Sequence, residues 1–563
     1  MKRVLFFVAA VLFGAALLCT AAPAFAKDLD ARPEGLLPAT VPISQILNAY
    51  DAAAGKRPPG VQDTSSEEWT FTRAGLAGTE KLVRSGFDYY AHITSGPLSD
   101  EYGQFLGHGW HRDQNGVVSP AGSHDQNSFD MLLFMNALND ASDPKNDVTL
   151  LGQTADSRPA YVLAVKQTGQ KHSEYVYYDK QSGLIQKVSH VSDGTRITIA
   201  YDDYRKTKGL SQPWHVHAGD GTPSLDFDFK RSSLKVGGDL DAMQFTMPAS
   251  SFAFESFSGH QKLPAKVFWD QWTIDVGNGY EHDAESPTLV VRLNIGGRGL
   301  DFAVSAAEPD TLIDFDVAQQ LQLPSYGQVT HAEGKDVPYD TILPAADLGG
   351  LMLRKLAVRA TPFHYHLNDE TKVVGVLGYD VLSTGVFKID YDNSTLDVFP
   401  AQDFDNPALG GDAYSIPVLF DSGYPFFQGT LDSHISANIL FDNDFEMSYV
   451  FGGFTGKYPE SVKDVVTGKD HGMATIPFAD SKGYGKDVHV WLGKVPDVQF
   501  GPAHFLNYQI VAADGDIEFG GHPVDAVMGG DLLRYYDIYL DYPHNRIFLK
   551  PNADFFKAFK VKQ

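Results

Sequence analysis

The chain has almost no cysteine and only one long apolar run. That run, Val4–Leu18, follows Lys2 and Arg3 and precedes Ala24-Phe25-Ala26. A basic start, an apolar centre and an A-x-A site are typical of a cleavable secretory signal peptide, predicted here at 1–26. The one cysteine, Cys19, leaves with it, so a mature chain beginning at Lys27 has no disulfide or thiol chemistry.

No second apolar run approaches the roughly 20 residues needed to span a bilayer, so we expect no transmembrane anchor. The product is predicted to be periplasmic or secreted.

Positive charge is also scarce. Lys and Arg total 45 against 71 Asp and Glu, a formal net charge of −26. Removing Lys2 and Arg3 with the signal takes this to −28 (−26 − 2). This balance argues against nucleic acids and anionic lipid headgroups as partners.

Several catalytic motifs are missing: His-Glu-x-x-His, Gly-x-Ser-x-Gly, the phosphate loop and the dinucleotide fingerprint. His215-x-His217 and His364-x-His366 each place two imidazoles on one side of a strand, but no third ligand is suitably spaced. We therefore predict no metal and no cofactor.

Two segments occur twice in the same order. Residues 373–400 align without a gap on 524–551, and 288–307 align on 425–444. The coinciding pairs include Val376/Val527, Gly378/Gly529, Asp380/Asp531, Leu382/Leu533, Asp390/Asp541, Tyr391/Tyr542 and Pro400/Pro551. A strand-rich repeat of this length predicts two copies of one domain.

The repeat resembles the retropepsin-like aspartic proteases, in which an apolar-apolar-Gly segment is followed by x-D-x-L and then by apolar-Asp-Tyr. Residues 376–382 with 389–391, and 527–533 with 540–542, fit that pattern. The resemblance implies a bilobal, pepsin-like pair of β-barrels related by a pseudo-twofold axis, with lobes at 262–405 and 406–563.

The catalytic positions depart from that family. Its Asp-Thr/Ser-Gly triplets are replaced by Ser305-Ala306-Ala307 in the first lobe and by Asp442-Asn443-Asp444 in the second. Two carboxylates about 3 Å apart share one proton in such enzymes, and a serine cannot replace one of them. Of the two middle residues, only Asn443 can still hydrogen-bond across to the other loop. The candidate site therefore consists of Asp442 and Ser305 at the degenerate catalytic positions, with Asn443, Asp444, Ala306, Ala307, Gly378 and Gly529 around them.

Other acidic residues near the repeats are better explained by structure. Asp421-Ser422-Gly423 spells the family triplet but precedes the strand that should come before it, so we read it as a surface turn. Asp380 and Asp531 stand where a short helix begins and are expected to cap it. Glu308 could reach the space left by Ser305, although nothing in the sequence positions it there.

Residues 27–260 have a different pattern: one amphipathic helix near 41–50, then alternating aromatic-rich strands separated by turns. The rhythm of 177–185 and 198–204 resembles the antiparallel meander of LolA-like, lipoprotein-carrier sheets. The predicted fold class is thus mainly β, a curved LolA-like sheet followed by the protease-like pair. A sheet of this kind either holds an acyl chain or peptide on its apolar face or merely packs on the second half.

Three functions remain open. The favoured one is an exported pseudo-protease, whose cleft binds an extended peptide or protein ligand without cutting it. The second is an active peptidase using Asp442, for example through pairing with Asp442 of a second molecule. The third is a lipid or lipoprotein carrier acting through the N-terminal sheet.

Overall fold

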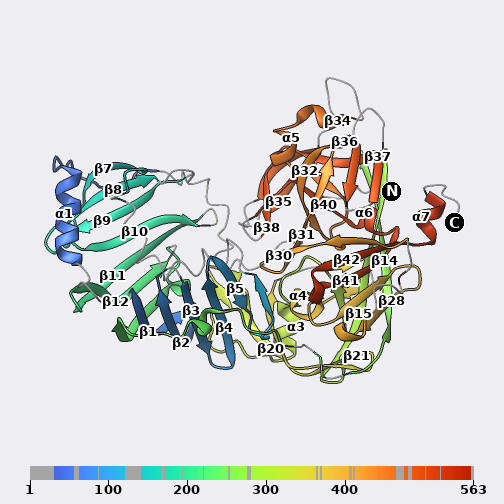
Figure 1. The fold of residues 1–563 in the computed structure, drawn as a ribbon, viewed down its shortest axis with the longest axis horizontal. Coiled ribbons are helices and arrows are strands. Elements are labelled where there is room, and N and C mark those ends of the chain that lie inside the picture. Colours follow the sequence, from blue (N-terminus) through green and yellow to red (C-terminus); the bar gives the residue numbers. More distant parts are fainter. Residues whose placement is uncertain are drawn as a thin grey trace.

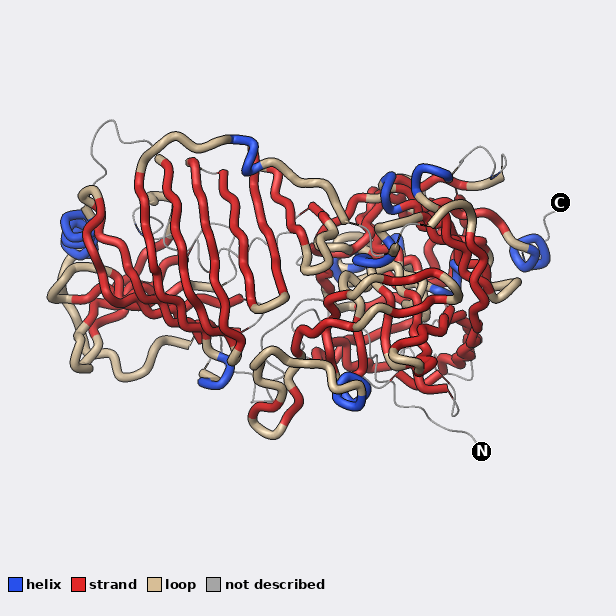
Figure 2. The backbone as a smooth tube through the Cα atoms, turned by 90° about the horizontal axis from the view of Figure 1, so that it is seen from below, coloured by secondary structure: helices blue, strands red, loops and turns tan. Residues whose placement is uncertain are grey.

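The computed structural model describes residues 31–558, except for 56–62, 87, 121–140, 142, 167–171, 193–194, 220, 252–253, 256, 276–280, 363–364, 368–370, 405–408, 410–411, 465–473, 480–484, 501–502 and 520–521. The predicted signal peptide and its cleavage site lie outside the described residues. Strands dominate throughout, and the first of them form a large curved antiparallel sheet (Figures 1 and 2). The expectation of a mainly β chain that begins with such a sheet is confirmed.

The first sheet has thirteen strands in the order β6-β5-β4-β3-β2-β1-β13-β12-β11-β10-β9-β8-β7. The chain runs outward from β1 to β6 and returns inward from β7 to β13, so β1 pairs with β13 at the centre. The bounds are β1 Thr64–Arg73, β2 Leu76–Ser85, β3 Asp88–Ser95, β4 Leu98–Phe105, β5 His108–Arg112, β6 Val118–Pro120, β7 Asp147–Gln153, β8 Ala160–Lys166, β9 Glu174–Asp179, β10 Ile185–Ser192, β11 Thr195–Thr207, β12 Leu210–Gly219 and β13 Phe227–Val236.

Helix α1 (Ile43–Ala54) lies along the β7–β12 half of this sheet (Figure 1), and the Ala53 oxygen accepts from the Ser211 hydroxyl of β12 at 2.6 Å. Its one fully buried side chain is Ile46, and Tyr50 packs edge-on against Tyr178 with ring centroids 5.6 Å apart. The helix begins two residues later and runs four residues further than its expected range of 41–50. Gly55, at φ +84°, ends it where an added Cβ would lie 2.0 Å from the Gly209 oxygen.

The second half forms mainly a fourteen-stranded and a nine-stranded sheet, and the larger one joins eleven strands of the first repeat to three strands of the second. The first repeat comprises β14 Gln261–Asp275, β15 Glu281–Ile295, β16 Arg298–Val304, β17 Leu312–Asp314, α3 Phe315–Gln320, β18 His331–Ala332, β19 Lys335–Asp336, β20 Tyr339–Leu343, β21 Ala346–Leu348, β22 Leu351–Leu353, β23 Leu356–Thr361, β24 Tyr365–Leu367, β25 Thr371–Val373, β26 Gly375–Leu377, α4 Tyr379–Leu382, β27 Val386–Asp390 and β28 Thr395–Phe399. The second comprises β29 Tyr414–Pro417, β30 Leu419–Asp421, β31 Tyr424–Leu431, β32 Ile435–Phe441, β33 Tyr449–Val450, α5 Gly452–Thr455, β34 Lys463–Asp464, β35 Ala474–Ala479, β36 Gly485–Phe500, β37 Ala503–Ala513, β38 Ile517–Phe519, β39 His522–Val524, β40 Ala526–Met528, α6 Gly530–Leu533, β41 Tyr536–Asp541, β42 Arg546–Pro551 and α7 Ala553–Ala558.

The repeated segments occupy equivalent places in these sheets. β16 runs parallel to β26, which is antiparallel to β17; likewise β32 runs parallel to β40, which is antiparallel to β33. Val304 pairs with Leu377 and Phe441 pairs with Met528. These pairs are related by the two alignment shifts, 441 − 304 = 137 and 528 − 377 = 151.

The repeats join through β27 and β41, and this pairing is symmetric. Phe387 lies opposite Leu540, Lys388 opposite Tyr539, and Ile389 opposite Ile538. Adding 151 to 387, 388 and 389 gives 538, 539 and 540, so each end of the pairing is the equivalent of the other. A self-complementary contact of this kind is the property of a twofold interface. The two copies are therefore related by a pseudo-twofold axis near Lys388 and Tyr539.

The N-terminal sheet contacts the first repeat through the turn between β5 and β6. The Asn115 side chain accepts from the Ala357 backbone nitrogen (2.7 Å) and donates to the Ala357 oxygen (2.9 Å) and to an Asp380 carboxylate oxygen (2.9 Å). The Val329 nitrogen also donates to the Ala74 oxygen at 2.6 Å. These bonds fix the sheet against the end of the repeat pair that holds α4.

Candidate functional site

The turns that follow β16 and β32 meet at the centre of the repeat pair. The Asn443 side chain bridges them: its Oδ1 accepts from the Ala306 nitrogen at 2.7 Å, and its Nδ2 donates to the Val304 oxygen at 2.9 Å. The Ser305 nitrogen donates to the Leu377 oxygen (3.2 Å), and the Asp442 nitrogen donates to the Met528 oxygen (3.1 Å). The structure thus brings the two predicted loops together and shows the cross-loop hydrogen bond expected of Asn443.

Two equivalent tyrosines lie at this junction. Tyr542 belongs to the second repeat, and its hydroxyl donates to the Ala306 oxygen of the first at 2.8 Å. Its equivalent in the first repeat, Tyr391, lies beside Asn443 and close to Asp442 and Asp444 in the second. Tyr542 therefore supports the loop of the opposite repeat, a role that the sequence pattern did not reveal, whereas the Tyr391 hydroxyl has no hydrogen-bond partner within the described residues.

The polar side chains at the junction are buried. Ser305 is 1% exposed and Asp442 is 2% exposed, and the Ser305 hydroxyl has no hydrogen-bond partner within the described residues. Burial raises the pKa of Asp442 to about 6, although hydrogen bonds from the backbone of Asp444 and Phe445 oppose the shift. Ala306, Ala307 and Asp444 are buried beside them.

A second carboxyl group lies close to Asp442. Glu308 is 5% exposed, and its Oε1 has no hydrogen-bond partner among the described residues. Burial above all, then Asp310 and Asp442, raises its pKa well above the usual value, while Arg359 lowers it. The junction thus combines an acid from each repeat with an unpaired serine hydroxyl. Sequence reasoning undervalued Glu308 because it lies three residues beyond the position that the family pattern specifies.

Gly378 and Gly529 serve the backbone. They precede α4 and α6, and an added Cβ would lie 2.6 Å from the Glu308 oxygen and 2.4 Å from the Met447 oxygen. Both positions require glycine because another chain segment passes too closely for a side chain.

Asp380 and Asp531 are not the capping residues that we expected, because the glycines hold that position and each aspartate lies in the first helical turn. Asp380 accepts from the Thr311 hydroxyl at 2.6 Å, and Asp531 accepts from the Ser448 hydroxyl at 2.7 Å. Thr311 and Ser448 differ by 137 and are therefore equivalent. The two bonds tie each short helix to the strand that follows the central turn.

The other candidates have structural roles. Asp421-Ser422-Gly423 forms the turn between β30 and β31, with positive φ at Ser422 and Gly423. Gly423 is buried against Pro309, so this turn is less exposed than we predicted. His215 and His217 face Asp228 and Asp226 on neighbouring β13 and its preceding turn. His364 lies outside the described residues.

A second candidate site is the face of the N-terminal sheet against which α1 packs, which we call the inner face. On it, alternate residues of β1 and β8–β13 form an apolar cluster. Its buried members are Ile46, Trp69, Phe71, Ala141, Leu163, Val165, Val176, Tyr178, Ile185, Val188, Ile197, Ile199, Tyr201, Val216, Ala218, Phe227 and Phe229. The hydroxyls of Tyr178 and Tyr201 are buried in it with no hydrogen-bond partner among the described residues. Burial is the main cause that raises the pKa of both phenols.

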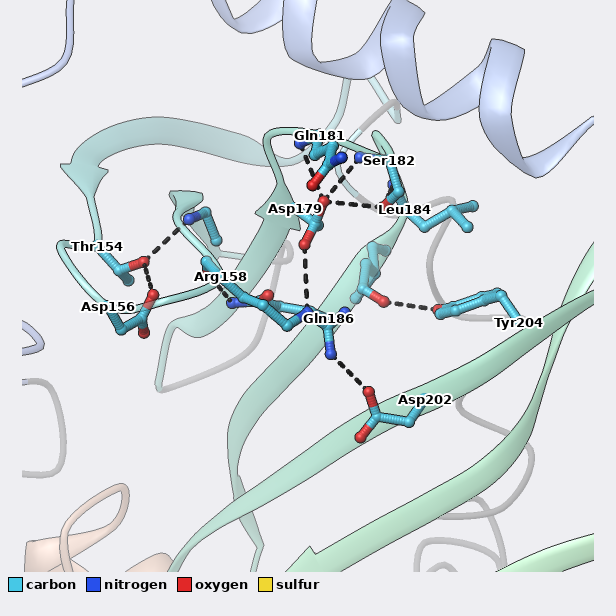
Figure 3. Close-up of polar contacts among 12 residues, drawn as sticks. Thr154, Asp156, Arg158, Asp179, Gln181, Ser182, Leu184, Gln186, Asp202 and Tyr204 are labelled. Carbon is cyan, nitrogen blue, oxygen red and sulfur yellow. Dashed lines mark hydrogen bonds and ion pairs between the residues drawn. The ribbon is translucent and has the colours of Figure 1, made fainter.

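A polar network holds the corner of the sheet under α1 (Figure 3). Arg158 bridges Asp179 (3.4 Å) and Asp202 (2.6 Å), and the Tyr204 hydroxyl donates to the Ile185 oxygen at 2.6 Å. Asp179 also accepts from the backbone and hydroxyl of Ser182. Burial by itself would raise the pKa of Asp179. The hydrogen bonds from Ser182 and Gln181 and the charge of Arg158 outweigh it, so the pKa is lowered.

Comparison with known proteins gives distant likenesses. No family model matches the chain, and no curated protein matches it. Among solved structures, a DUF1329 family protein from Desulfovibrio piger is 15% identical over 36% of this chain and 94% of its own, with a TM-score of 0.27. A LolA superfamily protein from Nitrosomonas europaea is 14% identical over 37% and 98%, with a TM-score of 0.23. Conglutin gamma from lupine seeds is 10% identical over 53% and 98%, with a TM-score of 0.29. TM-scores this low place the chain in no family.

Within the described ranges, no helix has the length and apolarity to cross a membrane. In that same part of the chain, no three His, Cys, Asp or Glu side chains are grouped so as to hold a metal ion.

Proposed function

We propose that this protein is an exported carrier that holds the apolar chain of a lipid or lipoprotein on the inner face of its N-terminal sheet. The observation that carries the proposal is the pair of unpartnered hydroxyls of Tyr178 and Tyr201 inside the apolar cluster. A buried polar group without a partner costs about 1–3 kcal/mol, and an ordinary core avoids that cost. A bound molecule with an oxygen near the start of its apolar chain would remove it.

In this proposal, helix α1 moves off the apolar cluster when the ligand binds. Ile46 is its one fully buried side chain, with Ile43, Leu47 and Tyr50 partly buried against the apolar cluster. Burying one isoleucine side chain stabilises the folded state by about 1.5–3 kcal/mol. Displacing the helix therefore costs the free energy of only a few such side chains. A chain of similar volume could then replace the displaced side chains. The signal peptide predicted at 1–26 would deliver the carrier to the periplasm or the exterior.

Binding of an uncharged alkyl chain tests this proposal. The mature chain would be titrated with decanol while tyrosine fluorescence and native mass are recorded. Binding with one-to-one stoichiometry is expected, and Tyr201→Phe should weaken it by about tenfold or less because one hydrogen bond is lost. Tyr326, which is outside the apolar cluster, supplies the matched control Tyr326→Phe. A folded protein that binds no decanol would refute the carrier function.

The repeat pair supports a second candidate, a protease-like unit that binds an extended peptide without cutting it. Ser305 stands where its equivalent, Asp442, carries the carboxyl group, and its unpaired hydroxyl could bond a ligand. With this candidate we propose three domains in the mature chain, namely the N-terminal sheet at 27–260 and the two protease-like lobes at 262–405 and 406–563. A quenched peptide library at acid to neutral pH tests this candidate, with Asp442→Asn as control. Cleavage that Asp442→Asn abolishes would make the protein an active peptidase instead.

A further inference from the structure

Four charged side chains, three of them buried and Arg84 partly buried, form a group on the inner face of the N-terminal sheet, next to the apolar cluster. We call Glu67, Glu80, Arg84 and Arg231 the charged cluster. On the central strands Trp69 lies opposite Arg231 on one side and opposite Glu80 on the other. The Arg231 guanidinium carbon lies 4.4 Å from the centre of the Trp69 ring. Since Trp69 belongs to the apolar cluster, the two clusters are continuous.

Some of these groups are paired and others are not. Glu67 accepts from Arg231 Nη2 at 2.8 Å and from Trp69 Nε1 at 3.2 Å, and lies 3.6 Å from Arg84. Arg231 Nε and Nη1, Arg84 Nε and both oxygens of Glu80 have no hydrogen-bond partner within the described residues. The Arg231 side chain is 1% exposed and Glu80 is 2% exposed, so bulk water does not supply the missing partners.

The local charge is positive. Burial first, and then the Glu67 charge, raises the pKa of Glu80 to about 8 although Arg84 lowers it, so Glu80 is mostly neutral at pH 7. The charged cluster then has two guanidinium groups against one carboxylate. Arg231 and Arg84 offer free N–H groups, and the protonated Glu80 offers an O–H. Apart from the carbonyl oxygen of the protonated Glu80, all the unpaired groups are donors, and what these donors lack is an acceptor with negative charge.

We propose that the charged cluster binds an anionic oxygen group, a phosphate or carboxylate, that heads an amphiphile whose chain lies on the apolar cluster. This inference rests on the carrier function and adds the class of headgroup to it. It departs from the expectation drawn from net charge, which argued against anionic headgroups. Net charge acts at long range and is screened by salt, whereas the charged cluster acts at contact distance in a desolvated site.

The test compares two molecules of equal chain length that differ at the head. Decyl phosphate and decanol would be titrated into the wild-type protein, Arg231→Gln and Arg205→Gln. Arg205 is the control because it is 54% exposed and pairs with Asp203 outside the charged cluster. In the wild type and in Arg205→Gln we expect decyl phosphate to bind at least about tenfold tighter than decanol, because charge-assisted hydrogen bonds are the strong ones.

In Arg231→Gln that preference should disappear while decanol still binds as in the wild type, which also shows that the variant is folded. Equal affinity for both molecules in the wild type would overturn the headgroup site and leave the carrier function standing. Failure of both to bind would refute the carrier function as well. Inorganic phosphate alone should bind at least about a hundredfold more weakly than decyl phosphate, since it buries no alkyl chain. Equal affinity for phosphate would mean a small-anion site and overturn the amphiphile.

Discussion

Replacing Asn443 should lower the stability of the repeat pair more than replacing any other buried polar side chain at the junction between the repeats. Asn443→Ala removes two buried hydrogen bonds and leaves the Ala306 nitrogen and the Val304 oxygen without a partner. Each orphaned group costs about 1–3 kcal/mol, so the free energy of unfolding should fall by roughly 2–6 kcal/mol. For a unit of this size that corresponds to a melting temperature lower by roughly 4–12 °C.

The assay is differential scanning calorimetry of the mature protein, because the N-terminal sheet and the repeat pair can then unfold in separate transitions. Tyr542→Phe is the matched control. It removes only the 2.8 Å bond to the Ala306 oxygen and should cost about half of the larger effect, because it leaves one buried group without a partner and not two. If Asn443→Ala left the repeat-pair transition within about 1 °C of wild type, the buried bridge would contribute nothing and the reasoning would be refuted.

Three further predictions concern other contacts. Gly378→Ala and Gly529→Ala should each lower the melting temperature of the repeat pair by several degrees in calorimetry, because a Cβ would lie under 3.0 Å from backbone oxygen; unchanged transitions would show that the close approaches relax freely. Asn115→Ala should move the melting transition of the N-terminal sheet further from that of the repeat pair, since it removes the paired bonds to Ala357; two transitions at the wild-type spacing would contradict this. The pKa of Glu80 is raised from 4.5 to about 8 in the folded protein. The unfolded chain therefore releases this proton near pH 4.5 while the folded state keeps it, so the free energy of unfolding falls as pH rises from about 4.5 to 8. Glu80→Gln should therefore gain stability relative to wild type between pH 5 and pH 8 in denaturant titrations, and a pH-independent difference would show that Glu80 stays ionised.

The repeat was the strongest guide that the sequence offered. Its two shifts, 137 and 151, place Asn443 against Ala306 before any coordinates are known, because a gap-free alignment carries strand register with it. The same alignment, continued by four residues, would have paired Thr311 with Ser448 and so revealed the partners of Asp380 and Asp531. The curved first sheet followed from alternating aromatic strands and turn residues, which are local signals.

The charged cluster could not be found in this way. Glu67 and Arg231 are 164 positions apart and meet only because β1 pairs with β13, a closure that no local pattern predicts. Glu308 was visible but unplaced, since its position depends on how the turn after Ser305 folds back toward Asp442. Net charge could not point to such a site for a physical reason: it averages over a surface, whereas the two arginines of the charged cluster act only on what touches them.

The measurement that tests the central claim most directly is native mass spectrometry of the mature wild-type protein with decanol. The carrier function predicts a one-to-one complex that Tyr201→Phe weakens and Tyr326→Phe does not. A folded protein that forms no complex, or one that both variants weaken equally, would contradict a lipid-binding role for the inner face of the N-terminal sheet.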